Sequence, residues 1–268
     1  MKLNELFFAG FGVLILLPID IQKYFDFVPF QSLNMINEHI DSICECLLVR
    51  REGKYCIIWS EKKKVILCTC QVKECLTKII GLLADVFEER TPYVLFHGSV
   101  VRERKGNNVI FLGQNHIGKS TMLQYMIEKK GAIYISDDIV FLNANTMKFE
   151  SNQYLPILHR ERNANGVFEE KYITPAQNWI SESRPGGKKT IFIYLVCREG
   201  ETKMEEILGY EKVIILLASL WRKDRKYMST ICDLASTMVM YKCCFDELGK
   251  RIDIIFSLLG DKIDEENY

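Results

Sequence analysis

The chain has no excess of charge of either sign, because its 35 lysine and arginine residues balance 35 aspartate and glutamate residues. This balance gives no electrostatic reason to expect a nucleic acid or a membrane surface as a partner. Proline is scarce, at 6 of 268 residues, while 48% of the residues are hydrophobic and 26% are charged. These are ordinary globular proportions, which exclude collagen-like and disordered chains. The length indicates one large domain or two small ones.

No apolar run reaches the length of about 20 residues that a membrane-spanning helix needs. The apolar segment 6–17 ends at Pro18, has little basic charge before it and lacks a small-residue cleavage site, so a signal peptide is not expected. Gly10 and Gly12 disfavour a helix. We therefore expect a buried strand over Phe8–Leu17, with a peripheral membrane anchor as the alternative.

The ten cysteines include no C-x2-C pair. Most lie in apolar runs, such as residues 66–70, where a thiol behaves as a small hydrophobic side chain. We expect reduced core thiols in a cytoplasmic protein. A zinc site built from Cys68, Cys70 and Cys75 is the less favoured alternative, because its spacing fits none of the usual structural zinc sites.

Some sequence signatures of known enzyme classes are also missing. The chain has no His-Arg-Asp or Asp-Phe-Gly triplet, which excludes a eukaryotic-type protein kinase. No Gly-x-Gly-x-x-Gly follows a strand pattern, so a dinucleotide-binding fold has no support.

Hydrophobic periodicity changes near Pro92 and predicts two parts. We expect a small α+β N-terminal unit over residues 1–90 with a role in substrate recognition, a core over 91–260 and a polar tail over 261–268. The N-terminal unit is predicted to hold strands at 8–17, 43–49, 55–60 and 65–70 and a helix over 72–88. The core is predicted to hold strands at 93–96, 99–102, 109–112, 132–136, 139–142 and 190–196. A helix is predicted to follow the loop 113–121 and to end near residue 130, and further helices are predicted at 213–220, 229–241 and 245–259. Residues 152–165 show no regular pattern.

Residues 113–121 fit the phosphate-binding loop G-x4-G-K-[ST], between an apolar strand pattern and a helical one. Glycines allow successive N–H groups to turn toward phosphate oxygens, and the helix that follows adds the positive end of its dipole. Lys119 is expected to reach the β and γ phosphates and Ser120 to bind Mg2+. A purely structural glycine-rich turn is the alternative. The predicted nucleotide-binding residues are Gly113, Asn115, His116, Ile117, Gly118, Lys119, Ser120 and Thr121.

Two adjacent carboxylates, Asp137 and Asp138, end the first strand after the loop helix. Consecutive residues at a strand end point to opposite sides. One carboxylate can therefore hold Mg2+ while the other accepts a proton from an acceptor hydroxyl. A solvated turn, in which aspartate is common, is the alternative.

The order of these motifs is informative. His97-Gly98 in a strand precedes the loop 113–121, and Gly131 separates the loop helix from the strand that ends at Asp137-Asp138. The stretch 93–142 resembles HPr kinase/phosphorylase and the related serine kinases. The resemblance implies an α/β fold with a P-loop-containing, HPr-kinase-like core of a mixed sheet flanked by helices, and it implies ATP and Mg2+ as cofactors.

The same resemblance implies roles for single residues. Asp138 would be the general base on the acceptor hydroxyl, and His97 would orient or tune the acidic pair. Asp137 would bind Mg2+ together with Ser120. Three arginines, Arg160, Arg162 and Arg184, are candidates to neutralise the transferring phosphoryl group, with ordinary surface arginines as the alternative.

The chain lacks the acidic residue followed by Arg-Gly-x-Gly that marks the bifunctional HPr enzymes. We therefore expect a kinase that acts on a serine hydroxyl of a peptide, such as a lasso-peptide precursor. HPr itself or a small hydroxyl compound remains an alternative acceptor. A nucleotide-sensing module without acceptor chemistry is the alternative function. A homo-oligomer is an expectation from the related enzymes alone.

Overall fold

The computed structural model describes most of the chain from residue 91 to residue 245 and the strands that precede it. The described residues are 2–8, 11–17, 44–51, 54–59, 64–69, 91–103, 106–150, 157–162, 168–173, 190–197 and 203–245, with single helical positions at 74, 78, 81, 84, 85, 88, 89 and 255. The chain forms two compact units. The N-terminal unit comprises residues 1–93, 154–156 and 172–174, and the core unit comprises the remaining residues. The predicted tail 261–268 lies outside the described residues.

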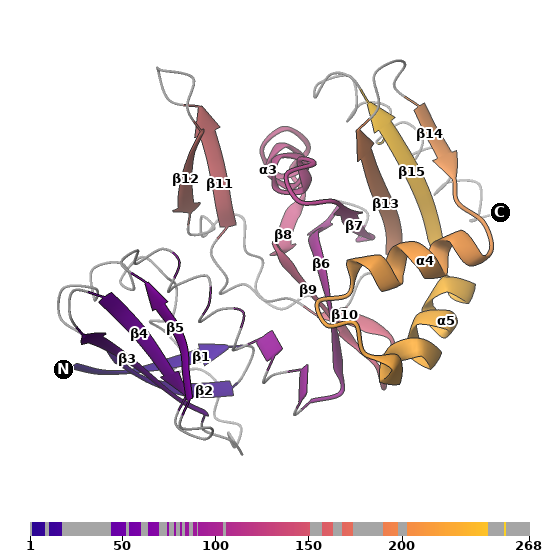
Figure 1. Cartoon of the computed structure of the whole chain (residues 1–268). Coiled ribbons are helices and arrows are strands. Elements are labelled where there is room, and N and C mark those ends of the chain that lie inside the picture. The colour runs from indigo at the N-terminus through magenta and orange to yellow at the C-terminus, as the bar shows by residue number, and fades with distance from the viewer. Residues whose placement is uncertain are drawn as a thin grey trace. The chain divides into compact units, whose positions relative to one another are not determined.

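The N-terminal unit contains a 5-stranded sheet with the order β1-β2-β3-β4-β5 (Figure 1). Its strands are β1 (Lys2–Phe8), β2 (Phe11–Leu17), β3 (Cys44–Arg51), β4 (Lys54–Trp59) and β5 (Lys64–Thr69). β2 and β3 pair in parallel, and the other neighbours are antiparallel. The prediction of a single strand over Phe8–Leu17 is wrong, because Phe8 pairs with Phe11 in a β1–β2 hairpin. The prediction used Gly10 only as a residue that disfavours a helix, although glycine is also typical of turns.

The core unit contains an 8-stranded mixed sheet with the order β10-β9-β6-β7-β13-β15-β14, in which β8 also pairs with β6. The strands are β6 (Tyr93–Arg102), β7 (Asn108–Gly113), β8 (Ile133–Ser136), β9 (Ile139–Asn143), β10 (Lys148–Glu150), β13 (Thr190–Cys197), β14 (Lys203–Glu206) and β15 (Val239–Phe245). β7, β13 and β15 run parallel, whereas β6 is antiparallel to β7 and β14 is antiparallel to β15.

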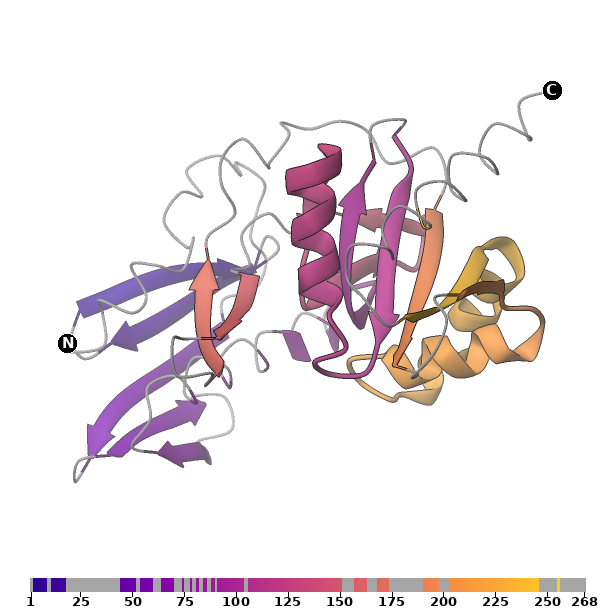
Figure 2. The same cartoon turned by 90° about the horizontal axis from the view of Figure 1, so that it is seen from above.

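Helices cover both faces of this sheet: α3 (Lys119–Lys130) lies on one face, and α4 (Tyr210–Ser219) and α5 (Met228–Thr237) lie on the other (Figure 2). Alternation along β7 explains the two cores. Val109 and Phe111 pack with the α3 side chains, and Ile110 and Leu112 pack with those of α4 and α5. A strand that is covered on both faces has a continuous apolar sequence, as β7 does. The prediction of an α/β fold with a mixed sheet flanked by helices is confirmed.

Two predictions in the second half of the chain are wrong. The predicted helix 229–241 ends early, because α5 stops at Thr237 and Met238 is extended, with φ −94° and ψ 155°. β15 then takes the place between β13 and β14. Residues 152–165, expected to be irregular, contain β11 (Ile157–Arg162), which pairs with β12 (Phe168–Ile173). Among the described residues, no helix combines the length and the apolar character that crossing a membrane requires.

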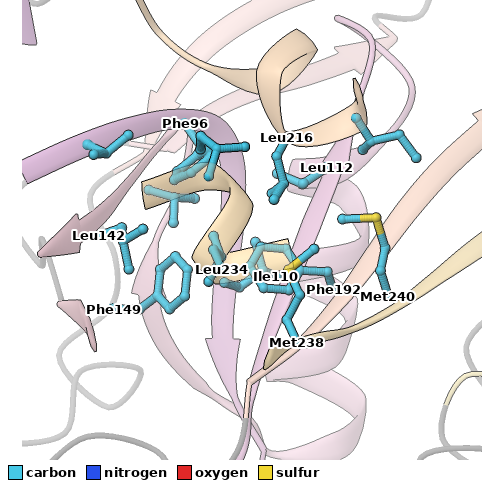
Figure 3. Packing of buried hydrophobic residues seen from close by; sticks show 14 of the residues in the cluster. Phe96, Ile110, Leu112, Leu142, Phe149, Phe192, Leu216, Leu234, Met238 and Met240 are labelled. Atoms are coloured by element: carbon cyan, nitrogen blue, oxygen red, sulfur yellow. The ribbon is translucent and has the colours of Figure 1, made fainter. Parts of the chain in front are cut away.

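The core between the sheet and α4 and α5 is closed around Phe192 (Figure 3). The Phe192 ring is fully buried and meets Phe149 edge to face, with 5.6 Å between ring centroids and 71° between ring planes. Such aromatic contacts add to the free energy gained by burial.

We expect Phe192→Ala to lower the free energy of unfolding by about 3–5 kcal/mol, because it removes a buried ring and leaves a cavity. Ile214→Ala on α4 is the matched control, since Ile214 is 55% exposed. Urea denaturation followed by circular dichroism measures both. Equal losses in the two variants would show that Phe192 is not part of a closed core.

Candidate active site

The predicted phosphate-binding loop joins β7 to α3, and its backbone adopts conformations that favour glycine. Gly113 has φ 146° and Gly118 has φ 101°. A Cβ atom at Gly113 would lie 2.8 Å from the carbonyl oxygen of Leu195, the residue of β13 with which Gly113 pairs. A Cβ atom at Gly118 would meet nothing within 4 Å. The loop is therefore tight on the side of the sheet and open at Gly118, where a ligand can approach the backbone.

The first turn of α3 is suited to an anion. In the part of the chain that the structure describes, no side chain caps this end, and no acidic residue lies in the first turn. Lys129 and Lys130 occupy the last turn, as the helix dipole favours. The unpaired N–H groups of the first turn and the positive dipole end together attract phosphate groups.

Backbone carbonyl groups of the loop hold the Lys119 side chain in place. Its Nζ donates to the carbonyl oxygens of Gly113 and Gln114, each at 3.0 Å. Burial lowers the pKa of Lys119, and the nearby Asp138 and Asp137 oppose that shift. The two loop carbonyl groups thus fix the position of the ammonium group.

Asp137 is the buried centre of the site. Its Oδ1 accepts a hydrogen bond from Ser120 Oγ at 3.1 Å and a second from Ser99 Oγ. Its Oδ2 is buried and has no hydrogen-bond partner among the described residues. Burial raises the pKa of Asp137 to about 6, and the hydrogen bonds from the two serines act in the opposite direction.

These groups fit a hard divalent cation. Mg2+ prefers carboxylate and hydroxyl oxygens, and it commonly binds through one or two protein ligands, phosphate oxygens and water. Asp137 supplies a buried carboxylate oxygen without a partner beside the Ser120 hydroxyl. The described residues hold no group of three or more histidine, cysteine, aspartate and glutamate side chains suited to a metal. A magnesium ion held together with nucleotide phosphates does not need such a group.

Asp138 lies at a tight turn between β8 and β9. It has φ 66°, a left-handed conformation that is uncommon outside glycine. Its carbonyl oxygen accepts a hydrogen bond from the Gly98 N–H at 3.3 Å, and its side chain is 48% exposed. β8 ends at Ser136, so the turn, rather than strand alternation as predicted, separates the exposed Asp138 from the buried Asp137.

His97 contacts the exposed carboxylate: its Nδ1 lies 3.2 Å from Asp138 Oδ1. Burial lowers the pKa of His97 below its ordinary 6.5, and the charge of Asp138 and a hydrogen bond with the Asn115 side chain oppose the shift. A neutral imidazole with its proton on Nδ1 can donate to Asp138. The Trp221 ring lies near His97, with 6.4 Å between the two ring centroids.

The structure gathers His97, Lys119, Ser120, Asp137 and Asp138 around one loop. Asn115, His116 and Thr121 are exposed, and Gly113, Ile117 and Gly118 are partly buried.

The sequence offers three arginines that could neutralise the charge of a transferring phosphoryl group. Two of them, Arg160 and Arg162, lie on β11, which neighbours α3. Their side chains lie outside the described part, as does Arg184 altogether. Cys68 lies on β5, and Cys70 and Cys75 also fall outside the described residues.

Sequence analysis missed two residues of the site. Ser99 donates to Asp137 across 38 positions of the chain, and Trp221 lies beside His97. The only sequence signal for Ser99 is its place directly after His97-Gly98. No signal marked Trp221, because its contact depends on how α4 ends against β6.

No protein-family model matches the chain, and a search of curated proteins finds no similar sequence. The resemblance to HPr-kinase-like enzymes therefore depends on the motifs between residues 93 and 142.

The raised pKa of Asp137 makes stability depend on pH. Between pH 3.8 and about 6 the folded chain keeps the Asp137 proton and the unfolded chain loses it. The free energy of unfolding therefore falls as the pH rises through this interval and stays lower above it. The full shift corresponds to a loss on the order of 3 kcal/mol.

We expect Asp137→Asn to remove this fall, so that the variant gains stability over the parent chain from pH 4 to pH 7. Urea denaturation at a series of pH values, without nucleotide or divalent cations, measures the difference. Asp233→Asn, which neutralises an exposed carboxylate on α5, is the matched control. An Asp137→Asn profile parallel to that of the parent chain would contradict the expectation.

Proposed function

We propose that the chain is an ATP-dependent kinase that transfers the γ-phosphoryl group to a serine hydroxyl of a peptide, such as a natural-product precursor of the lasso type. The observation that carries the proposal is the unequal environment of two adjacent aspartates. Asp137 is buried beside Ser120, and Asp138 is half exposed beside His97. The buried Asp137 carboxylate is suited to binding a cation, and the half-exposed Asp138 carboxylate is suited to accepting a proton from an acceptor hydroxyl.

The nucleotide half of the site consists of the loop, Lys119, Ser120 and Asp137. The open backbone at Gly118 and the first-turn N–H groups of α3 would bind phosphate oxygens. Lys119 would exchange its two loop carbonyl partners for phosphate oxygens. Ser120 and Asp137 would hold Mg2+, which, when bound, neutralises charge on the β and γ phosphates.

The acceptor half consists of Asp138 and His97. The serine oxygen attacks the γ phosphorus, the bond between that phosphorus and the β–γ bridging oxygen breaks, and ADP leaves. The Asp138 carboxylate accepts the hydroxyl proton. His97 Nδ1 lies 3.2 Å from Asp138 Oδ1 and would hold the carboxylate in position toward the acceptor.

The same geometry favours a kinase over a nucleotide sensor. A sensor requires the loop, the lysine and the cation ligands. A sensor does not require an exposed carboxylate that a histidine orients beside the nucleotide site. The choice of a peptide acceptor follows from the resemblance over residues 93–142 and from the missing Arg-Gly-x-Gly segment; HPr and small hydroxyl compounds are the acceptors to test against it.

We expect Lys119→Ala to weaken ATP binding by about 10- to 100-fold, the range for losing charge-assisted hydrogen bonds. Isothermal titration with Mg2+ and ATP measures the affinity. Lys129→Ala, exposed at the far end of α3, is the matched control and should bind ATP like the parent chain. Unchanged affinity in Lys119→Ala would exclude the loop as the nucleotide site.

We expect Asp138→Asn to bind ATP and Mg2+ nearly as well as the parent chain and to lose at least about 100-fold in transfer rate, the effect of removing a general base. Label from γ-labelled ATP, followed into serine-containing peptides, measures transfer. Asp233→Asn serves as the control for a neutralised exposed aspartate. Full transfer by Asp138→Asn would remove the residue from the mechanism.

A further inference from the structure

A basic segment lies next to the acceptor half of the site. Residues 221–226, Trp-Arg-Lys-Asp-Arg-Lys, connect α4 to the 3-10 turn η2 (Arg225–Tyr227) that precedes α5. The Trp221 N–H donates to the Leu95 carbonyl oxygen at 2.8 Å, and Leu220 forms an antiparallel bridge with Phe96. Figure 1 shows this connection beside β6. The segment is thus attached to the two residues that directly precede His97.

Both ends of the basic segment are anchored in the core. Leu220 on one side and Tyr227 on the other are buried members of the cluster between the sheet, α4 and α5. Inside the segment, the Asp224 carboxylate accepts a hydrogen bond from the Lys226 N–H at 3.0 Å and caps η2. The backbone is therefore held in one place relative to β6.

The charge of the segment contrasts with that of the centre. Four of its residues are basic, and its single acid, Asp224, is engaged in the cap of η2. Lys226 lies over the Tyr227 ring, with Nζ 4.7 Å from the centroid. Lys223 and Arg225 are exposed, and neither forms an ion pair within the part of the chain that the structure describes. These two cations are available to bind an anionic group of another molecule.

The position of residues 221–226 indicates which ligand they can bind. The Trp221 ring is 6.4 Å from the His97 ring, and His97 contacts Asp138, the carboxylate for the acceptor. The nucleotide phosphates have their own partners in the loop, Lys119 and the first turn of α3. An extended peptide advances about 3.3 Å per residue, so a side chain two to four positions from the acceptor serine lies about 7–13 Å from it. Lys223 and Arg225 follow Trp221 by two and four positions in the chain.

We propose that residues 221–226 form a docking surface that selects acceptor peptides with aspartate or glutamate two to four positions from the serine. This inference rests on the proposed kinase function and names the class of its substrate. Complementary charge of this kind contributes to specificity and to the rate of association.

The test is a binding measurement that needs no catalysis. Two fluorescent peptides of equal length carry alanine in place of the serine; one has flanking glutamates, and the other has glutamines. Fluorescence anisotropy, with Mg2+ and a non-hydrolysable ATP analogue present, gives their affinities. We expect the acidic peptide to bind about fivefold more tightly or better, as two exposed ion pairs allow, and to lose this advantage at high salt.

We expect Lys223→Ala/Arg225→Ala to lower the affinity for the acidic peptide to that for the glutamine peptide and to leave the affinity for the ATP analogue unchanged. Lys129→Ala/Lys148→Ala removes the same charge from exposed positions on α3 and β10 and should bind like the parent chain. Equal binding of the two peptides, equal effects of the two double variants, or a loss of nucleotide affinity in the first would overturn the proposal.

A matched pair of peptides with the serine restored separates the two claims. Charge-dependent binding without phosphate gain on the bound serine peptide would support the docking surface and contradict the kinase function. Phosphorylation of both serine peptides at equal rates would support the kinase function and contradict the docking surface.

Discussion

The buried carboxylate of Asp137 joins three elements that are far apart in the sequence. Ser99 on β6 and Ser120 in the first turn of α3 both donate to the same oxygen of a residue that follows β8. This arrangement connects the start of the loop helix to the part of β6 that carries His97. It also leaves the second carboxylate oxygen without a partner among the described residues, at a position where a cation would satisfy it. A site of this kind is destabilising without a ligand, because burial penalises the charge.

The left-handed turn at Asp138 follows from this arrangement. Because Asp137 is held inside by the two serines, the next residue leaves the sheet through a strained conformation and presents its carboxylate to solvent. Strained backbone at a functional position is commonly part of the mechanism. Here it separates two adjacent carboxylates into one buried group and one half-exposed group. The segment Trp221–Lys226, whose first residue is hydrogen-bonded to Leu95 of β6, carries exposed cations.

Local patterns predicted the parts of the site that depend on near neighbours. The loop and the start of α3 follow from a motif in which glycine, lysine and serine occur at set spacings, and the aspartate pair from its place at the end of the next predicted strand. Partners that meet across the sheet were not predictable in this way. Ser99 reaches Asp137 only because Val100 of β6 pairs with Ser136 of β8. The predicted helix 229–241 includes the first three residues of β15, because the hydrophobic pattern of a short apolar segment does not separate a helix from a buried strand. Pairing with β13 determines the conformation of β15.

The fate of the γ phosphate distinguishes a kinase from a nucleotide-binding module. Purified protein, Mg2+ and γ-labelled ATP are incubated with a set of serine-containing peptides and small hydroxyl compounds, and mass spectrometry locates the label. A kinase with the site described here transfers the label to a peptide serine, as a stable phosphate ester. Tight binding of ATP with label that stays in ATP or appears only as inorganic phosphate, for every acceptor offered, would contradict the assignment of Asp138 as the base for a hydroxyl acceptor.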